Sequence, residues 1–278
     1  MTVQLATHKL RSTFLSMKNK IILFIPVYNC ESQIKRVLAA ISNTQLSDKI
    51  DGLLIIDNRS QDNTVTSVIE SIAHLNFENI WVYRNSLNYN LGGSHKIAFN
   101  LAVQWNYSHL ITLHGDDQAD VNDIFKILAL IDTDSFEMML GSRFMRGSII
   151  DGYSSFRVLG NYVLNLAVSF RMFKFVSDLG SGLNAFSADF MKESFFAGCS
   201  DGLTFNNHLI LCDRRRDRKR VFFPITWTEK DQVSNARVFR QAYEIVKLIF
   251  LYNRPRSVHK KVDSCTHSVH ESNLVGGN

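Results

Sequence analysis

An apolar run at residues 109–113 stops abruptly in polar and acidic side chains whose types could bind a metal ion. These side chains are Asp116, Asp117, Gln118 and Asp120. Hard divalent cations take several oxygen ligands, and magnesium is usually held by one or two carboxylates together with substrate phosphates. A second interpretation is a solvated turn in which Asp120 or Asn122 caps the helix that starts near Val121. The surrounding elements must decide between a metal site and a helix cap.

Three earlier apolar runs end in the same kind of polar loop, and each loop is followed by a helical pattern. The predicted strands are 21–25, 53–56, 80–83 and 109–113, and the predicted helices are 34–41, 65–72, 94–105 and 121–131. Four strand–helix steps with right-handed crossovers predict an α/β fold, a mostly parallel sheet with helices on both faces. The carboxyl ends of parallel strands meet at one edge of the sheet, where such folds bind ligands. The candidate metal ligands would lie at that edge.

In the second half of the chain, predicted strands and helices alternate less regularly. It predicts a strand at 138–143, an amphipathic helix or helix pair at 158–176, a glycine-rich loop at 177–182, a helix from Ala185 onward, a strand at 221–227 and an amphipathic helix at 236–252. From residue 257 the chain turns polar and aperiodic, which predicts a disordered tail. The predicted organisation is an extension at 1–19, one domain at 20–230 with halves at 20–145 and 146–230, a C-terminal helix at 231–256 and the tail at 257–278.

The composition excludes several classes of protein. With 278 residues, 45% of them hydrophobic, the chain can bury a large core. Its four cysteines form no C-x-x-C pair, so neither a zinc site nor a disulfide framework is indicated, and a reducing, cytoplasmic setting is expected. The sequence contains no apolar run of about 18 residues, so no membrane span is predicted. The basic run at 214–220 suits a solvated turn or peripheral attachment to the inner face of a membrane. It lacks interleaved aromatic residues, so no nucleic-acid partner is expected.

Five motifs, taken together, carry a resemblance to a known family. They are Pro26-Val27-Tyr28-Asn29, the run from Asp57 to Thr64, Asn90-Leu91-Gly92-Gly93, Asp116-Asp117-Gln118 and Gly141-Ser142-Arg143. In order and spacing they resemble family-2 glycosyltransferases with the GT-A fold, over about residues 20–145. The segments at 178–183 and 223–225 are more loosely similar to the branch of dolichol-phosphate mannose synthase and polyprenyl-phosphate sugar transferases.

The resemblance implies a GT-A domain with a C-terminal helical extension and an inverting sugar transfer. The implied donor is a nucleoside-diphosphate sugar, based on UDP, GDP or dTDP, and the acceptor is a polyprenyl phosphate or a cell-surface glycan. Two alternatives stay open: a nucleotidyltransferase, and a catalytically degenerate module that binds nucleotide sugars or glycans. The loop after the first strand argues against the former, because it lacks a glycine-rich phosphate loop with a basic residue.

The residues that the resemblance implies for the nucleotide sugar are Pro26, Tyr28, Asn29, Glu31, Asp57, Asn58, Ser60, Asn90, Gly92, Lys96, Gly115, Asp116 and Arg143. Asp57 is similar to the carboxylate that accepts from the base, and Asn58 replaces a commoner second aspartate. Gly92 permits close backbone approach at a helix start, where free N–H groups favour phosphate. A guanidinium such as that of Arg143 can bind phosphate through two hydrogen bonds. The alternatives are a helix cap for Asp57, an exposed lysine for Lys96 and a surface ion pair for Arg143.

The metal prediction, Mn²⁺ or Mg²⁺, depends on three residues. Asp116 matches the second acid of the family's D-x-D motif, Gln118 matches a glutamine that follows it, and His114 replaces the first acid. Histidine ligates manganese and other transition ions but suits magnesium poorly. His114 could instead face the diphosphate, and Asp117 could supply a compensating carboxylate.

Two residues are candidates for the catalytic base. Asp178 opens the glycine-rich loop and could act as a base or orient the acceptor. His208 stands near a position where many relatives have a glutamate, although a histidine in an amphipathic helix is often structural. A phosphate acceptor is already an anion, in which case positioning and charge stabilisation suffice and no base is needed.

Overall fold

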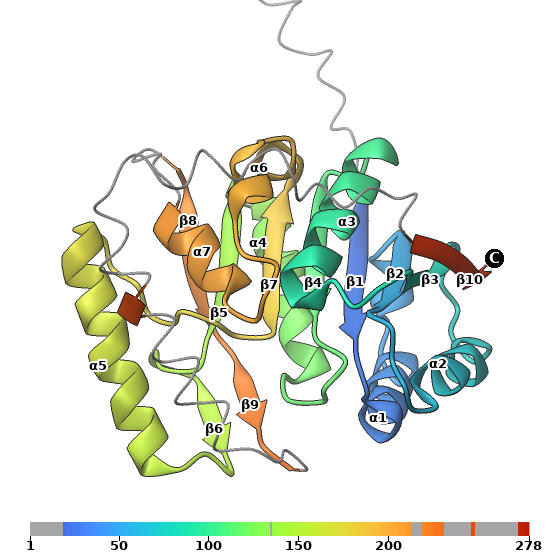
Figure 1. Ribbon diagram of the computed structural model, residues 1–278, viewed down its shortest axis with the longest axis horizontal. Coiled ribbons are helices and arrows are strands. Elements are labelled where there is room, and N and C mark those ends of the chain that lie inside the picture. The colour runs from blue at the N-terminus through green and yellow to red at the C-terminus, as the bar shows by residue number, and fades with distance from the viewer. Residues whose placement is uncertain (1–18, 134, 213–217, 231–245, 248–271, 278) are drawn as a thin grey trace, which may run out of the picture.

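The computed structural model describes residues 19–133, 135–212, 218–230, 246–247 and 272–277. These residues form an eight-stranded sheet in the order β10-β3-β2-β1-β4-β7-β5-β8 and a two-stranded sheet of β6 and β9 (Figure 1). The strands are β1 (Ile21–Val27), β2 (Gly52–Asp57), β3 (Ile80–Asn85), β4 (His109–Leu113), β5 (Met138–Ser142), β6 (Ile149–Asp151), β7 (Leu183–Ser187), β8 (Arg220–Pro224), β9 (Thr226–Thr228) and β10 (Ser272–Gly277).

Helices pack on both faces of the sheet. They are α1 (Glu31–Ser42), η1 (Leu46–Asp48), α2 (Thr64–Ile72), α3 (Asn90–Gln104), η2 (Val121–Asp123), α4 (Ile124–Thr133), α5 (Ser155–Met172), α6 (Ala188–Met191), η3 (Phe195–Gly198) and α7 (Phe205–Cys212). Alternate residues of β1 belong to two separate hydrophobic cores. Leu23 and Ile25 pack in the core that contains α1, α2 and α4. Ile22 and Phe24 pack in the core that contains α3 and α7. Burial on both faces explains why the central strands have continuous apolar sequences.

The strand directions bring the polar loops to one edge, as predicted. Strands β1, β2, β3 and β4 are parallel, with Val27 beside Asp57 and Ile21 beside His109. Strand β7 runs antiparallel between β4 and β5 and pairs Leu183 with Leu113. The loop before β7 therefore meets the loop after β4 at the carboxyl edge of the parallel strands. The predicted α/β fold with a mostly parallel sheet is confirmed.

Several predicted elements need correction. The prediction of a helix from Ala185 onward is wrong at its start. Leu183–Ser187 forms strand β7, and the helix α6 that follows spans Ala188–Met191. The single strand expected at 221–227 is divided into β8 and β9 at Ile225. Within the predicted disordered tail, Ser272–Gly277 forms β10 and pairs antiparallel with β3. The extension at 1–18 and most of the predicted helix at 236–252 lie outside the described residues.

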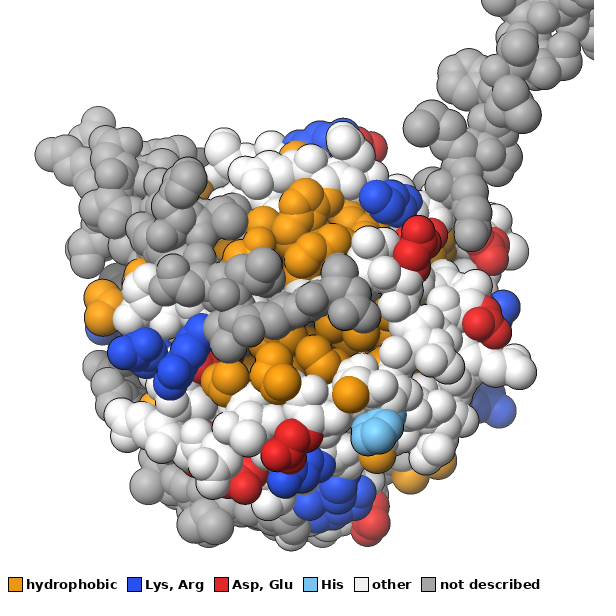
Figure 2. Space-filling model, turned by 90° about the vertical axis from the view of Figure 1, so that its right-hand side faces the viewer, with side chains coloured by type: hydrophobic (Ala, Val, Ile, Leu, Met, Phe, Trp, Pro, Cys, Tyr) orange, Lys and Arg blue, Asp and Glu red, His pale blue; other side chains and the backbone are white. Residues whose placement is uncertain are grey.

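The two ends of the sheet present different surfaces. Figure 2 views the end that carries β3 and β10, and hydrophobic side chains gather on this face. Half-buried aromatic residues of this end include Trp81 and Tyr83 on β3 and Trp105 after α3, and the rings of Trp81 and Trp105 stack at 4.3 Å. At the opposite end, α5 is the outermost helix (Figure 1). None of the helices described is both long enough and apolar enough to cross a membrane.

Candidate active site

The backbone is strained in the loops at the carboxyl edge. Four residues that are not glycine have positive φ angles there: Asn29 (47°), Arg59 (69°), Asn90 (58°) and Asp117 (58°). Each lies in the polar segment that follows one of the four parallel strands. Such conformations cost about 1–3 kcal/mol each and persist where the surrounding structure holds them, often at functional sites. Their concentration at one edge indicates that this edge is the functional one.

Hydrogen bonds join the loops after β1, β2 and β4 into one unit. The backbone N–H of Asn29 donates to Ser60 Oγ at 2.9 Å, and Gln61 donates to Asn29 Oδ1 at 2.8 Å. The N–H of Gly115 donates to the carbonyl of Pro26 at 3.2 Å. Tyr28 is 45% exposed beside these bonds. The structure thus brings Pro26, Tyr28, Asn29, Ser60 and Gly115 together, as the sequence predicts, although their binding of a nucleotide stays a prediction.

The centre of this edge is the pair His114 and Asp116. Nδ1 of His114 lies 4.0 Å from Oδ2 of Asp116, and the two side chains are 16% and 36% exposed. Burial raises the pKa of the Asp116 carboxyl to about 6 and lowers the pKa of His114 to about 4. At pH 7 the pair is therefore a neutral imidazole beside a carboxylate whose ionised form is disfavoured by partial burial, although its side chain is 36% exposed. A cation bound by both side chains would compensate that carboxylate.

Asp117, Gln118 and Asp120, which follow Asp116, make contacts of different kinds. Asp117 Oδ2 accepts from Arg36 Nε at 2.6 Å and from Lys230 Nζ at 3.3 Å. These ion pairs engage Oδ2 of Asp117, and the possible compensating role of this carboxylate stays a prediction. Gln118 is 8% exposed, and its backbone carbonyl accepts from the N–H of Thr228 at 2.8 Å, while the predicted metal contact of its side chain stays a prediction. This bond ties the loop to β9. Asp120 caps η2 by accepting from Asn122 N, as the second interpretation of the sequence proposed.

The donor set fits a metal ion that is shared with a substrate. Among the described residues, no three side chains of His, Cys, Asp or Glu are grouped so as to hold a metal by themselves. His114 and Asp116 place one ring nitrogen and one carboxylate oxygen 4.0 Å apart. Ions of the magnesium and manganese type are commonly held by one or two protein ligands together with phosphate oxygens. The pair therefore fits a metal–diphosphate complex better than a closed metal site.

Asp57 and Asn58 are buried at the end of β2 and make many hydrogen bonds. Asp57 accepts from the N–H of Ser60 at 3.1 and 3.2 Å and from Arg84 Nε at 3.1 Å. The carbonyl oxygen of Asn58 accepts from Asn85 at 3.0 Å and from the N–H of Tyr89. Asn58 thus holds the loops after β2 and β3 together. Its predicted contact with the base stays a prediction, as does that of Asp57.

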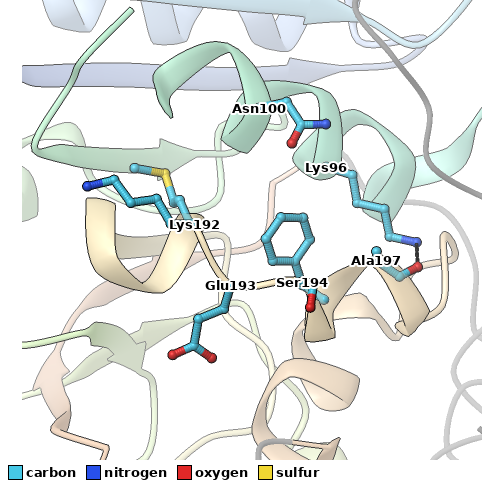
Figure 3. Close-up of a pocket in the computed structure, with 8 residues that line it drawn as sticks. Lys96, Asn100, Lys192, Glu193, Ser194 and Ala197 are labelled. Carbon is cyan, nitrogen blue, oxygen red and sulfur yellow. Dashed lines mark hydrogen bonds between the residues drawn. The ribbon is translucent and has the colours of Figure 1, made fainter. Parts of the chain in front are cut away.

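The predicted phosphate contacts of Gly92 and Lys96 require correction. The N–H of Gly92 donates to the carbonyl of Asp201 at 2.6 Å, and a Cβ at this position would lie 2.4 Å from the Ser200 carbonyl. Lys96 is 2% exposed and donates to the carbonyls of Ala197 and Cys199 and to Asp201 Oδ1, at 2.7–3.0 Å. Figure 3 shows its ammonium directed at Ala197, beside a pocket of about 230 Å³. Its three N–H donors are used, so none remains for a phosphate.

We expect Lys96→Met to lower the free energy of unfolding by about 3 kcal/mol and to leave nucleotide affinity nearly unchanged. The substitution removes the cation of a largely buried pair and two bonds to buried carbonyls. Urea unfolding and nucleotide titration measure the two quantities. Lys192→Met is the control, because this side chain is 61% exposed in its ion pair. A stable Lys96→Met protein with much weaker nucleotide binding would restore the original prediction.

Arg143 and Asp178 form a buried ion pair next to the His114 loop. Nε and one terminal nitrogen of Arg143 donate to the two Asp178 oxygens at 2.8 and 2.9 Å, and the N–H of Arg143 donates to Asp178 Oδ2 at 3.0 Å. The ring of Trp227 lies 5.1 Å from the guanidinium. Although burial opposes it, this carboxylate raises the pKa of Arg143. Asp178 is a poor general base because its lone pairs are occupied, so it is better suited to orient Arg143.

Helix α7 closes the same loop from the other side. Asn207 donates to the carbonyl of Leu179 at 3.1 Å, and Asn206 donates to that of Ser181 at 3.3 Å. The carbonyl of Gly182 in turn accepts from the N–H of His114 at 2.9 Å. His208 is half-buried on this helix. The predicted role of His208 as a base stays a prediction.

The architecture is shared with solved enzymes that transfer sugars. Glucosyl-3-phosphoglycerate synthase from Mycobacterium tuberculosis, solved with Mn²⁺, uridine diphosphate and phosphoglyceric acid, superposes with a TM-score of 0.63 at 14% identity, over 86% of this chain and 80% of that one. The same enzyme solved with Mg²⁺ and uridine diphosphate has a TM-score of 0.61 at 13% identity, over 84% and 79% of the two chains. The fold is the GT-A fold of glycosyltransferases.

Sequence comparison gives the family. Residues 22–193 match the glycosyl transferase family 2 model, and the chain belongs to this family. An uncharacterized protein of Methanocaldococcus jannaschii is 25% identical over 84% of this chain and 92% of its own length. UDP-N-acetylglucosamine–dolichyl-phosphate N-acetylglucosaminyltransferase of Methanococcus voltae is 28% identical over 63% of this chain and 73% of that protein. The chain is a family-2 glycosyltransferase, as its motifs predicted.

The sequence did not identify two residues that shape the site. A Cβ at position 182 would lie 2.9 Å from Cγ of His114, so Gly182 makes room for that ring. His95 is fully buried on α3, with its ring centroid 6.0 Å from that of His114. The polar run Ser94-His95-Lys96, inside a helix that is otherwise largely apolar, was a signal that could have identified His95.

Proposed function

We propose that this enzyme transfers a sugar from a nucleoside-diphosphate sugar to a polyprenyl phosphate, with inversion at the anomeric carbon and with a divalent metal ion at the diphosphate. The observation that carries the proposal is the pair of His114 Nδ1 and Asp116 Oδ2, 4.0 Å apart at the carboxyl edge. Further support comes from the solved enzyme with this fold, which was crystallised with Mn²⁺ or Mg²⁺ and uridine diphosphate. The relative from Methanococcus voltae is named for a dolichyl-phosphate acceptor.

In the proposed reaction an acceptor phosphate oxygen attacks the anomeric carbon. The new carbon–oxygen bond forms on the face opposite the diphosphate, and the electron pair of the breaking bond leaves with the diphosphate oxygen. A metal ion held by His114 and Asp116 would neutralise the charge of the leaving diphosphate. Asp178 fixes the guanidinium of Arg143 through two hydrogen bonds, which preorganises a cation beside the loop that carries Gly182. An anionic acceptor needs no base.

The exposed face of α5 supports a lipid acceptor. Large apolar side chains recur every three or four positions: Phe156, Leu159, Val163, Leu166, Phe170 and Phe173, which are 61–87% exposed. Residues 155–175 contain no acidic residue, and Arg171 and Lys174 lie near the C-terminal end of the stripe, whereas Arg157 at the other end is paired with Glu229 at 2.6 Å. An apolar stripe with basic residues beside it is the pattern of a helix that lies in the interface of an anionic membrane. The helix is also joined to the site, because Asn165 donates to the carbonyl of Ser177, the neighbour of Asp178.

We expect Leu166→Glu combined with Phe170→Glu to weaken binding to vesicles that contain anionic lipids by roughly 100-fold. Each substitution removes about 1.5 kcal/mol or more of apolar burial, and 1.4 kcal/mol corresponds to a factor of ten. Sedimentation with vesicles measures the change. Ile69→Glu on α2, which replaces an apolar side chain that is 38% exposed, should bind like the wild type. If the double variant bound vesicles normally and altered only the oligomeric state in light scattering, the face would join two copies of the chain instead.

A transfer assay tests the proposed function. Labelled UDP-, GDP- and dTDP-sugars are incubated with polyprenyl phosphate in detergent, with Mn²⁺, with Mg²⁺ or with a chelator, and the lipid products are identified by mass. A sugar-phosphate lipid formed only with metal is expected. Transfer to a glycan but not to the lipid would correct the acceptor. Release of pyrophosphate from a nucleoside triphosphate and a sugar phosphate would favour a nucleotidyltransferase, and binding without turnover would favour a degenerate module.

A further inference from the structure

Two imidazole rings lie together behind the metal-facing edge. His95 on α3 is fully buried, and its ring centroid is 6.0 Å from that of His114, with the ring planes at 70°. In the part of the chain that the structure describes, Nε2 of each ring is buried and has no hydrogen-bond partner. A buried polar atom without a partner costs free energy comparable to a lost hydrogen bond. Two such atoms on adjacent rings therefore point to an interaction between them.

The surroundings of His95 fix which of its nitrogens carries the hydrogen. Nδ1 lies 2.9 Å from the carbonyl oxygen of Leu91, and a carbonyl can only accept. Nδ1 is therefore the protonated nitrogen of the neutral ring, and Nε2 presents a lone pair. Phe24 and Phe205 have ring centroids 5.2 Å from that of His95 and offer no conventional hydrogen-bond donor. Among the described rings that lie against His95, which also include Phe99, His114 has the one ring that carries polar atoms.

The ring of His114 has two distinct sides. Its Nδ1 lies 4.0 Å from Asp116 Oδ2, whereas its Nε2 is buried. The tight contact with Gly182 and the bond from the N–H of His114 to the Gly182 carbonyl hold the residue in this place. If Nε2 carries the hydrogen, a water between the rings can accept from it and donate to the lone pair of His95, so that both buried atoms gain a partner. The same tautomer leaves the lone pair of Nδ1 facing Asp116.

We propose that His95 is a positioning residue that holds His114 in the tautomer with hydrogen on Nε2, through one buried water between the two rings, so that Nδ1 serves as a metal ligand. This inference rests on the proposed metal–diphosphate site. It explains how a histidine can stand at the first position of the D-x-D motif that the sequence resembles: the chain supplies an acceptor behind the ring, as metal-bound histidines generally require. A nitrogen ligand of this kind favours Mn²⁺ over Mg²⁺.

The tautomer of His114 in the metal-free, full-length protein is the first test. Long-range ¹H–¹⁵N correlation spectra of histidine-labelled protein, assigned with His95→Phe and His114→Gln, separate a protonated ring nitrogen from one with a lone pair. We expect Nε2–H and an unprotonated Nδ1 for His114. A hydrogen on Nδ1 of His114 would overturn the inference. This readout needs neither donor nor turnover, so the inference and the proposed function can fail separately.

The second test measures binding of Mn²⁺ in the presence of UDP by electron paramagnetic resonance. His95→Phe, which keeps an aromatic ring among its aromatic neighbours, should bind Mn²⁺ about 10-fold to 100-fold more weakly, as expected when the partner of a ligating histidine is lost. Mg²⁺ affinity should change less. His95→Gln retains an acceptor and should recover part of the loss, and His109→Phe, at the far end of β4, should not change it. Wild-type Mn²⁺ affinity in a folded His95→Phe protein would contradict the inference. If that variant does not fold, the tautomer of His114 in the wild-type protein decides the question.

Discussion

Asp116→Asn is expected to lower kcat/KM for sugar transfer roughly 1000-fold and, in the same protein, to raise the stability of the metal-free fold. The first effect follows from the loss of the carboxylate that faces His114 Nδ1, since a metal at a transferring diphosphate supplies several kcal/mol of charge stabilisation. The second follows from the pKa of Asp116, which burial raises to about 6. Steady-state kinetics and chemical denaturation measure the two effects.

The sign of the stability effect depends on pH. A carboxyl whose pKa is higher in the folded than in the unfolded state binds its proton more tightly when folded, so its contribution to stability falls as the pH rises through about 4 to 6. At pH 8 the ionised Asp116 therefore destabilises the fold. Asp116→Asn should raise the free energy of unfolding by about 1 kcal/mol, which is less than the full pKa shift implies because the side chain keeps contact with solvent. At pH 4 the gain should be close to zero.

A control separates the role of Asp116 from a general loss of acid in the loop. Asp117→Asn removes the neighbouring charge, whose carboxylate contacts Arg36 and Lys230 and does not face His114 Nδ1. It should retain activity within about tenfold of the wild type, because it breaks only partly exposed ion pairs. Equal losses of activity in the two variants would show that neither carboxylate has a specific role.

Asp178→Ala is expected to cost about 3–5 kcal/mol of unfolding free energy. The substitution leaves the guanidinium of Arg143, whose side chain is 10% exposed, without its carboxylate, and an unpaired buried charge is strongly unfavourable. Asp189→Ala is the matched control, since Asp189 is 88% exposed in its pair with Lys192 and should cost less than about 1 kcal/mol. Urea unfolding of both proteins gives the comparison.

A second substitution distinguishes a structural pair from a catalytic base. Combining Asp178→Leu with Arg143→Met removes both charges and should restore much of the stability, although activity should stay low. If Asp178 were the base, a folded Asp178→Asn protein would lose kcat with a change in its pH profile, and KM would stay nearly unchanged. That result would overturn the positioning role assigned to Asp178.

The parallel half of the fold was predictable because its strands are buried on both faces. Residues of β1, β2 and β4 read as apolar runs, and the polar residues that follow them mark the edge. Strand β7 was not recognised because Leu183–Ser187 is short and contains Asn184 and Ser187, and its place depends on pairing with β4 and β5. The early start of α3 was missed because Gly92-Gly93 looked like a break. Gly92 serves instead for close contact with Ser200 and Asp201.

Residue types at the site were predictable, but their partners were not. Lys96 reaches Asp201 across 105 positions, and Arg143 reaches Asp178 across 35. A lysine one turn inside a helix and an arginine after a strand are equally compatible with phosphate contacts and with buried ion pairs. Only the tertiary fold shows their partners: the ammonium of Lys96 is used entirely within the protein, and two N–H groups of Arg143 pair with Asp178. His95 escaped notice for the same reason, since its importance depends on His114, a residue on a different element.

The most direct measurement is the position of manganese in crystals grown with Mn²⁺ and a nucleoside diphosphate, taken from anomalous scattering. We expect one strong peak in bonding contact with Asp116, with Nδ1 of His114 as a second protein ligand and diphosphate oxygens completing the coordination. A nucleotide bound at this edge with manganese absent from Asp116, or manganese bound elsewhere on the protein, would contradict it.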